Sequence, residues 1–465
     1  MLMKRNVLSQ LGLGILILGV FLGVFNGLQN HNIYESTLGQ FSENYLREGT
    51  WENQYISKVA DPYRNISNDN LLNWDAAIYS CVSEQMYQPG TDCYGSVRGA
   101  FFPLFPIIWR VSHLNARGIS VLNYLLFTLS ISILIQLFLA VTPLKKNLVF
   151  VALITLPSSI IYFIPYSESL FLATMTIAIY GVMQRKYWYY FIGIALMSMV
   201  RPATLFILIA MLAMEAHSFL KYQELKRLSQ ELISKLSPFI IGYALTLIYQ
   251  YLYSGTWTTY LDAAEFWGGG LKPISSISDW SIEGFGLSIF ALSFVVLPSL
   301  IYLVRAVLRP SDSRTFSFSH YQSENPRNAL CVLSALYLSG IFLFTLLTSG
   351  GNLHSFFRFT LCSPFFYVLL LVLIDRTDTA LKVKIGFGLS TLLFLLLLFV
   401  LEFGGTRFSF SFFGPLLFIA YLAFLSTPIK INTLRIISLL ILVGSSIIWN
   451  SYLLNILLSN GYIFT

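Results

Sequence analysis

The stretch from Asn73 to Trp109 reads NWDAAIYSCVSEQMYQPGTDCYGSVRGAFFPLFPIIW and decides how the rest of the chain is interpreted. It is too polar to cross a bilayer and too aromatic for an ordinary flexible loop. Two prolines in its AFFPLFP run argue against a regular helix there. Aromatic rings anchor at headgroup depth, so we predict an interfacial platform that holds Asp75 at the membrane surface. An anchoring loop with an incidental acid fits these residues equally well. The platform residues are Trp74, Phe101, Phe102 and Pro103.

The composition indicates an all-α polytopic membrane protein. Hydrophobic residues make up 56% of the 465 positions and charged residues only 11%, with a mean hydropathy of +0.68. Soluble domains average about 25% charged residues. The net charge of +7 does not indicate nucleic acid, because the basic residues lie in short loops between apolar runs, where they set orientation.

The apolar runs predict about thirteen membrane-spanning helices in a single membrane domain of residues 1–465, since about 20 residues cross the hydrocarbon core. Residues 29–120 are predicted to form the first outer loop. Residues 215–235 carry apolar side chains at helical spacing and predict a basic amphipathic helix on the inner membrane surface. The predicted spans are Val7–Leu28, Val121–Val141, Leu148–Ile164, Leu170–Met183, Tyr187–Val200, Ala203–Ala216, Leu236–Tyr253, Gly286–Val304, Ala329–Thr348, Phe359–Ile374, Ile385–Leu401, Phe412–Ser426 and Ile436–Leu457.

The basic residues also predict the orientation. With a cytosolic N-terminus and alternating spans, most of the 29 lysines and arginines fall on the inner side, as the positive-inside rule requires. The alternation works only if Arg201 and Pro202 form an outer turn between two short helices. We therefore expect an integral, multi-pass protein whose site faces away from the cytosol.

The four cysteines offer no metal site. No C-x-x-C, H-E-x-x-H or His/Cys cluster is present, so no metal and no cofactor is expected. Cys81 and Cys93 share the first outer loop, and their spacing permits a disulfide if that loop faces an oxidising compartment.

Five ionisable residues from distant parts of the sequence are predicted to meet on the outer side: Asp75, Glu168, Arg201, His354 and Arg358. Ionisable residues near a membrane are costly and usually face a cavity. Each also has a simpler interpretation. The arginines can snorkel to headgroups, His354 can be a hydrogen-bonded structural residue, and Glu168 can cap the N-terminus of its helix.

Together the five residues suit chemistry on a lipid phosphate ester. An arginine presents a planar fork that matches phosphate oxygens. A carboxylate accepts a proton from an attacking hydroxyl when it lies within hydrogen-bond reach. Sugar transfer passes through a cationic ring, as glycoside hydrolysis does, and the phosphate that leaves needs positive charge nearby.

Three segments in this order resemble the PIG-V family, which is GPI mannosyltransferase II and its bacterial relatives. The segments are Trp74-Asp75-Ala76, the AFFPLFP run from Ala100 to Pro106, and PYSESLF from Pro165 to Phe171. The resemblance continues through Tyr187-Trp188 and Ala195 to Arg201 and ends near Arg358. It covers most of residues 70–210 and a patch near 350–365, and only the combination is specific.

The resemblance implies a GT-C fold and an inverting hexosyltransferase that uses a polyprenyl-phosphate sugar, mannose in the eukaryotic members. The acceptor would be a glycolipid or lipid-linked molecule in the bilayer, without nucleic acid. The implied roles are Asp75 as general base, Glu168 beside it in the catalytic set, and Arg201, His354 and Arg358 at the donor phosphate.

The sequence departs from the family pattern where the substrate path is expected. Ile78-Tyr79 follows the WD pair, Val97-Arg98-Gly99 precedes the AFFP run, and Pro202-Ala203 follows the basic turn. These departures leave the sugar and the acceptor open. Two other functions fit the same charges: a transporter or flippase of a lipid-linked sugar, and a non-catalytic subunit with the same scaffold.

Overall fold

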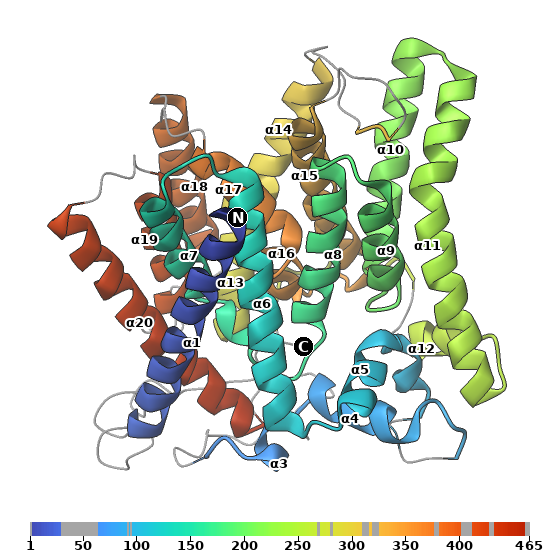
Figure 1. Ribbon diagram of the computed structural model, residues 1–465, viewed down its shortest axis with the longest axis horizontal. Coiled ribbons are helices and arrows are strands. Elements are labelled where there is room, and N and C mark those ends of the chain that lie inside the picture. Colours follow the sequence, from blue (N-terminus) through green and yellow to red (C-terminus); the bar gives the residue numbers. More distant parts are fainter. Residues whose placement is uncertain are drawn as a thin grey trace.

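Apolar helices make up most of the computed structural model (Figure 1). Within the described residues there is no named strand, and a single isolated parallel bridge joins Ser278 and Asn352. The all-α prediction is confirmed at this level. The structure describes residues 2–28, 64–90, 93, 95–266, 270–279, 282–308, 316–318, 325–375, 381–400, 412–426 and 432–460.

The helices follow one another with short connections. The first half holds α1 (Leu2–Leu28), α3 (Asn68–Leu71), α4 (Asp75–Gln85), η3 (Gly95–Ala100), α5 (Leu104–Ser112), α6 (Ala116–Phe138), α7 (Pro143–Ile154), η4 (Ser159–Tyr162), α8 (Glu168–Met183), α9 (Tyr187–Ser198) and α10 (Thr204–Tyr222). The second half holds α11 (Leu225–Ser254), α12 (Thr259–Phe266), α13 (Ile282–Ala291), the π-helical η5 (Leu292–Val296), α14 (Leu297–Leu308), α15 (Pro326–Thr348), α16 (Phe356–Leu361), α17 (Pro364–Asp375), α18 (Leu381–Val400), α19 (Phe413–Ser426) and α20 (Thr433–Leu458).

Local sequence signals set several helix ends. The side chain of Asn115 caps α6 by accepting from the Gly118 amide at 3.0 Å. Asn325 caps α15 in the same way, and Pro326 takes its first position, where no intrahelical amide bond is lost. The long α11 ends at Gly255 in the left-handed conformation, which glycine adopts without steric cost.

Six helical runs in the described residues are long and apolar enough to cross a membrane: Arg5–Leu28, Ala116–Phe138, Leu225–Ser254, Gly284–Val307, Pro326–Thr348 and Thr433–Leu458. Five shorter apolar helices accompany them, in α8, α10, α17, α18 and α19. This is consistent with an integral multi-pass membrane protein. The count of thirteen spans and the GT-C fold stay predictions.

The predicted span Leu148–Ile164 is not one helix. Helix α7 ends at Ile154, and the chain then turns through the 3-10 segment η4 before it enters α8. Pro157 lies in this connection. A proline disfavours the helical conformation of the preceding residue and donates no amide bond, so hydropathy alone overestimated the helix.

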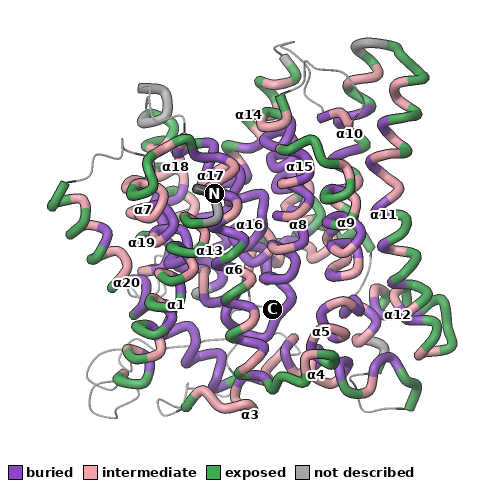
Figure 2. Tube along the Cα trace, in the orientation of Figure 1, coloured by how far each residue is buried: buried purple, intermediate pink, exposed green. Residues whose placement is uncertain are grey.

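Large apolar side chains cover the outer faces of the bundle. Leu16 on α1 is 62% exposed, Leu252 on α11 is 70% exposed and Leu440 on α20 is 64% exposed. Figure 2 shows buried residues in the middle of the bundle and exposed ones along α11. Helices that are apolar on their outside are expected where lipid replaces water.

The predicted amphipathic helix over residues 215–235 is wrong in form. Glu215 lies in the last part of α10, the chain turns at residues 223–224, and Lys235 lies in α11. The Lys235 ammonium lies 2.5 Å from Glu215 Oε1 and 3.3 Å from Glu231 Oε2, and all three side chains are buried. The charges cancel inside a helical hairpin instead of facing solvent.

The two ends of the bundle differ. Helices α4, α5 and α12 gather at the lower end in Figure 1, where α8 begins. The connections α6–α7, α8–α9 and α10–α11 lie in the upper half. The segment predicted as a platform therefore lies at the end opposite the basic connections.

The platform contains two helices and the 3-10 segment η3. The argument from the prolines was wrong, because α5 begins directly after Pro103 and carries Pro106 in its first turn. Amides of a first turn have no intrahelical acceptor, so a proline is tolerated there. The disulfide that the spacing permitted is present between Cys81 and Cys93, whose Cα atoms lie 5.7 Å apart.

The platform packs against α11 and α12 through Gly99. A Cβ atom at this position would lie 2.0 Å from the Thr259 carbonyl oxygen, so only glycine permits the approach. The Gln250 side chain of α11 donates to the Gly99 carbonyl at 2.9 Å. The platform is thus fixed to the helices behind it.

Candidate functional site

Four of the five predicted ionisable residues lie together, and each comes from a different element. Asp75 is the first residue of α4, and Glu168 is the first residue of α8. Arg201 lies in the turn between α9 and α10, and Arg358 lies in the short α16. The broken apolar segments place all four at helix ends, where side chains can converge.

The four residues form one chain of contacts. Arg358 Nη1 lies 2.7 Å from Asp75 Oδ2, and Arg358 Nε donates to Glu168 Oε1. Arg201 Nη1 donates to the same Glu168 oxygen at 2.5 Å. The order is Asp75, Arg358, Glu168, Arg201, with two positive and two negative charges. We call this set the ionic chain.

Burial divides the ionic chain into an inner and an outer part. The side chains of Glu168 and Arg358 are 1% and 3% exposed, whereas those of Arg201 and Asp75 are 12% and 19% exposed. Charges this deep are tolerated only when they are paired and hydrogen-bonded. Its two end residues, Asp75 and Arg201, are therefore the ones that a substrate can reach.

Aromatic rings lie against both guanidinium groups. The guanidinium carbon of Arg358 lies 4.7 Å from the centre of the Tyr166 ring, and that of Arg201 lies 5.1 Å from the centre of the Phe359 ring. A desolvated cation over a ring face is attracted by the ring quadrupole. Sequence reasoning assigned neither ring a role.

Tyr79 connects the platform to the ionic chain. Its hydroxyl donates to Ser167 Oγ at 2.7 Å, and its ring packs edge-on against Phe101 and Phe105, both at 4.8 Å between centres. Ser167 directly precedes Glu168. The platform phenylalanines thus fix α4 against the start of α8, which accounts for the aromatic run without requiring contact with a substrate.

A second connection joins the platform to Arg201. The amide of Leu104, which follows Pro103, donates to the Met199 carbonyl at 3.0 Å. Phe102 packs edge-on against Tyr243, whose hydroxyl donates to the Pro202 carbonyl at 3.3 Å. The turn that carries Arg201 is therefore held from both sides.

Trp74 gives Asp75 its direction. Trp74 has φ 55° and ψ −128°, a conformation that non-glycine residues rarely adopt. Just before it, the Asn73 side chain donates to the Leu457 carbonyl of α20 at 2.7 Å. Such strain persists only where the surroundings fix it, and here it sets the angle at which α4 begins.

His354 takes no part in the contacts of the ionic chain. It lies four residues before Arg358, and its amide accepts support from Asn352 by donating to Oδ1 at 2.9 Å. Burial, together with the nearby Lys272 ammonium, lowers the pKa of His354 from 6.5 to about 4. At neutral pH this histidine is uncharged, so it does not add a cation to the site.

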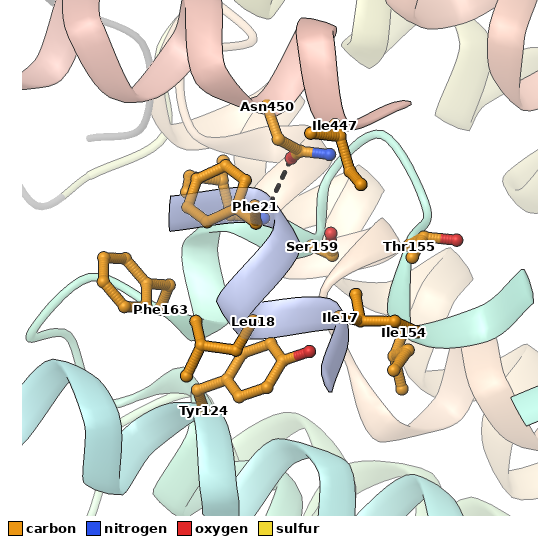
Figure 3. Close-up of a pocket in the computed structure, with 11 residues that line it drawn as sticks. Ile17, Leu18, Phe21, Tyr124, Ile154, Thr155, Ser159, Phe163, Ile447 and Asn450 are labelled. Carbon is orange, nitrogen blue, oxygen red and sulfur yellow. Dashed lines mark hydrogen bonds between the residues drawn. The ribbon is translucent and has the colours of Figure 1, made fainter. Parts of the chain in front are cut away.

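The cavity in Figure 3 lies elsewhere. It has an empty volume of about 380 Å³ and lies between α1, α6, the connection from α7 to α8, and α20. Its walls are mostly apolar, with Leu18, Phe21 and Phe163 among them, and the Asn450 side chain accepts from the Ile160 amide at 3.1 Å. None of its lining residues belongs to the ionic chain.

In the part of the chain that the structure describes, no three His, Cys, Asp or Glu side chains lie close enough to hold a metal ion. In comparisons with known proteins, no family model, no curated protein and no solved structure matched the chain. The resemblance to the PIG-V family accordingly stays a prediction from the motifs, and the ionic chain stands on its geometry.

Proposed function

We propose that this chain is a membrane glycosyltransferase. It transfers a sugar, mannose by the resemblance, from a polyprenyl-phosphate donor to a hydroxyl of a lipid-linked or glycolipid acceptor on the non-cytosolic face. The ionic chain carries the proposal. A carboxylate and an arginine, both partly exposed, are joined through a buried arginine and a buried glutamate at one end of an apolar bundle.

The reaction needs a base and a cation, and the two ends of the chain supply them. The acceptor oxygen forms a bond to the anomeric carbon, the bond from that carbon to the phosphate oxygen breaks, and Asp75 takes the hydroxyl proton. Arg201 binds the phosphate, because its guanidinium reaches the surface. A single displacement of this kind inverts the anomeric centre.

The buried pair serves the outer one. Arg358 donates to both Asp75 and Glu168 and is 3% exposed, which favours orientation of Asp75 over direct phosphate binding. Glu168 holds both arginines through one oxygen. His354, uncharged at neutral pH, supports this end of the site through hydrogen bonds instead of charge.

The test is sugar transfer by the purified protein in lipid nanodiscs, with a labelled polyprenyl-phosphate mannose and a lipid extract as acceptor. We expect Asp75→Asn to abolish transfer while insertion and stability are kept. Asp69→Asn is the matched control, because Asp69 lies nearby on α3 and is exposed. General base help is worth about 10²–10⁴-fold in rate. Turnover of Asp75→Asn close to that of the control would defeat the assignment.

A further inference from the structure

Tyr166 is a fully buried side chain in contact with the ionic chain. It lies in the turn between η4 and α8, two residues before Glu168, and its ring faces the Arg358 guanidinium at 4.7 Å. Its exposed fraction is 0%. A tyrosine that anchors in a membrane interface keeps its polar tip in water, as the 47% exposed Tyr189 does. Tyr166 does not fit that role.

The backbone around Tyr166 is fixed independently of the ionic chain. The side-chain amide of Asn123, on α6, donates to the carbonyls of Ile164 and Tyr166 at 2.7 and 2.8 Å. The Tyr166 amide donates to the Ile164 carbonyl at 2.8 Å. Asn123 is 1% exposed. The ring of Tyr166 therefore has a fixed position against which a long, flexible arginine can be oriented.

Arg358 is held by three groups. Glu168 accepts from its Nε, Asp75 accepts from its Nη1, and the Tyr166 ring lies against its guanidinium. A guanidinium is planar and donates only in its plane, while aromatic rings stack on its face. The two carboxylates fix its edges, and the ring fixes the tilt of the plane.

We propose that Tyr166 is a positioning residue of the site, acting on Asp75 through Arg358. The ring sets the plane of the guanidinium, and that plane sets where the Asp75 carboxylate is held relative to the acceptor hydroxyl. The role rests on the proposed function. It belongs to the ring and not to the hydroxyl.

The decisive comparison is Tyr166→Phe with Tyr166→Leu. Phenylalanine keeps the ring, so we expect its kcat to stay close to that of the wild type. Leucine removes the ring, and because a misplacement of about 1 Å costs roughly 10²-fold, we expect kcat to fall by ~10–100-fold with little change in the KM for donor. Equal losses in both variants would overturn the proposal, as would an unchanged kcat in Tyr166→Leu.

Tyr421→Leu is the control for general damage to the core. Tyr421 is also fully buried, but its hydroxyl pairs with Thr155 at 2.8 Å, away from the ionic chain. It should lose thermal stability and keep kcat per folded molecule. A fall in kcat as large as that of Tyr166→Leu would show that any buried tyrosine has the same effect, and would also overturn the proposal.

A second arm does not depend on catalysis. We expect the thermal shifts of Tyr166→Leu and Asp75→Asn to be less than additive in the double variant, because both act on Arg358. Additive shifts would overturn the positioning role. A wild-type protein that transfers no sugar would instead refute the proposed function, and the double-variant comparison would still decide whether Tyr166 and Asp75 are coupled.

Discussion

Replacing Glu168 by glutamine tests whether charge holds the inner part of the ionic chain together. Glutamine keeps the size of the side chain but leaves Arg201 and Arg358 with one carboxylate in place of two. The Glu168 side chain is 1% exposed, so water does not replace the lost charge. Removing one partner of a buried ion pair typically costs about 3–5 kcal/mol. We expect Glu168→Gln to lower the free energy of unfolding by this amount and to abolish transfer.

The loss should depend on which partner is removed. Arg201→Gln leaves Glu168 paired with Arg358 and removes a cation that is already 12% exposed, so we expect a smaller loss of about 1.5–3 kcal/mol, typical of a hydrogen bond to a charged group. In the double variant the remaining pair, Asp75 with Arg358, is neutral again. Its loss should fall short of the sum by about 0.5–3 kcal/mol.

The assay is denaturant unfolding of the purified protein in detergent, followed by tryptophan fluorescence. Glu84→Gln is the control, because Glu84 is an exposed acid on α4, and surface substitutions usually stay within about 0.5 kcal/mol. If Glu168→Gln unfolds like this control, the carboxylate does not hold two buried arginines, and the reasoning from burial and pairing fails.

Three further outcomes follow from the structure. The pKa of His354 is lower in the folded chain than in the unfolded one, so the unfolded state binds the proton more readily. Stability should therefore fall as the pH drops from about 6.5 toward about 4, by at most about 3 kcal/mol, and His354→Gln should flatten that slope in pH-dependent thermal unfolding. If the platform faces outward, an impermeant maleimide should label Asp69→Cys and not Ser229→Cys in intact cells, and the reverse pattern would contradict the orientation. A protein with Cys81 and Cys93 both replaced by serine should be less stable by about 3 kcal/mol, and a wild type that gains mass by two thiol-alkylating groups at these cysteines without reduction would contradict the bond.

The convergence of charges could be predicted from the sequence because each charge interrupts an apolar context. Asp75, Glu168 and Arg201 each lie at the edge of an apolar run, and a membrane protein places such residues at a common surface or cavity. The pairing itself could not be predicted. Glu168 and Arg358 are 190 positions apart, and neither hydropathy nor charge alternation encodes which acid meets which arginine.

The failures have a physical cause in common, since a one-dimensional pattern does not distinguish solvated from paired polar groups. Residues 215–235 looked like a solvated surface helix because they carry many charges. In the structure Lys235 lies between two glutamates and is 2% exposed. Tyr166 looked like an interface anchor because tyrosine usually is one near a membrane. Only its contact with Arg358 gives it another role.

On the proposed function, the charge of the ionic chain changes in step with that of the substrate. With two carboxylates and two guanidinium groups, the chain is neutral before reaction. A phosphodiester donor carries one negative charge, and the phosphate monoester that leaves approaches two, since its second pKa is near 6. When Asp75 takes the acceptor proton, the chain becomes positive by one unit. The site therefore gains a positive charge in the step in which the leaving phosphate gains a negative one, and it does so without moving an arginine. Transition-state stabilisation requires this kind of differential interaction, and an isolated pair of arginines, charged equally before and after, would bind donor and product phosphate with less discrimination.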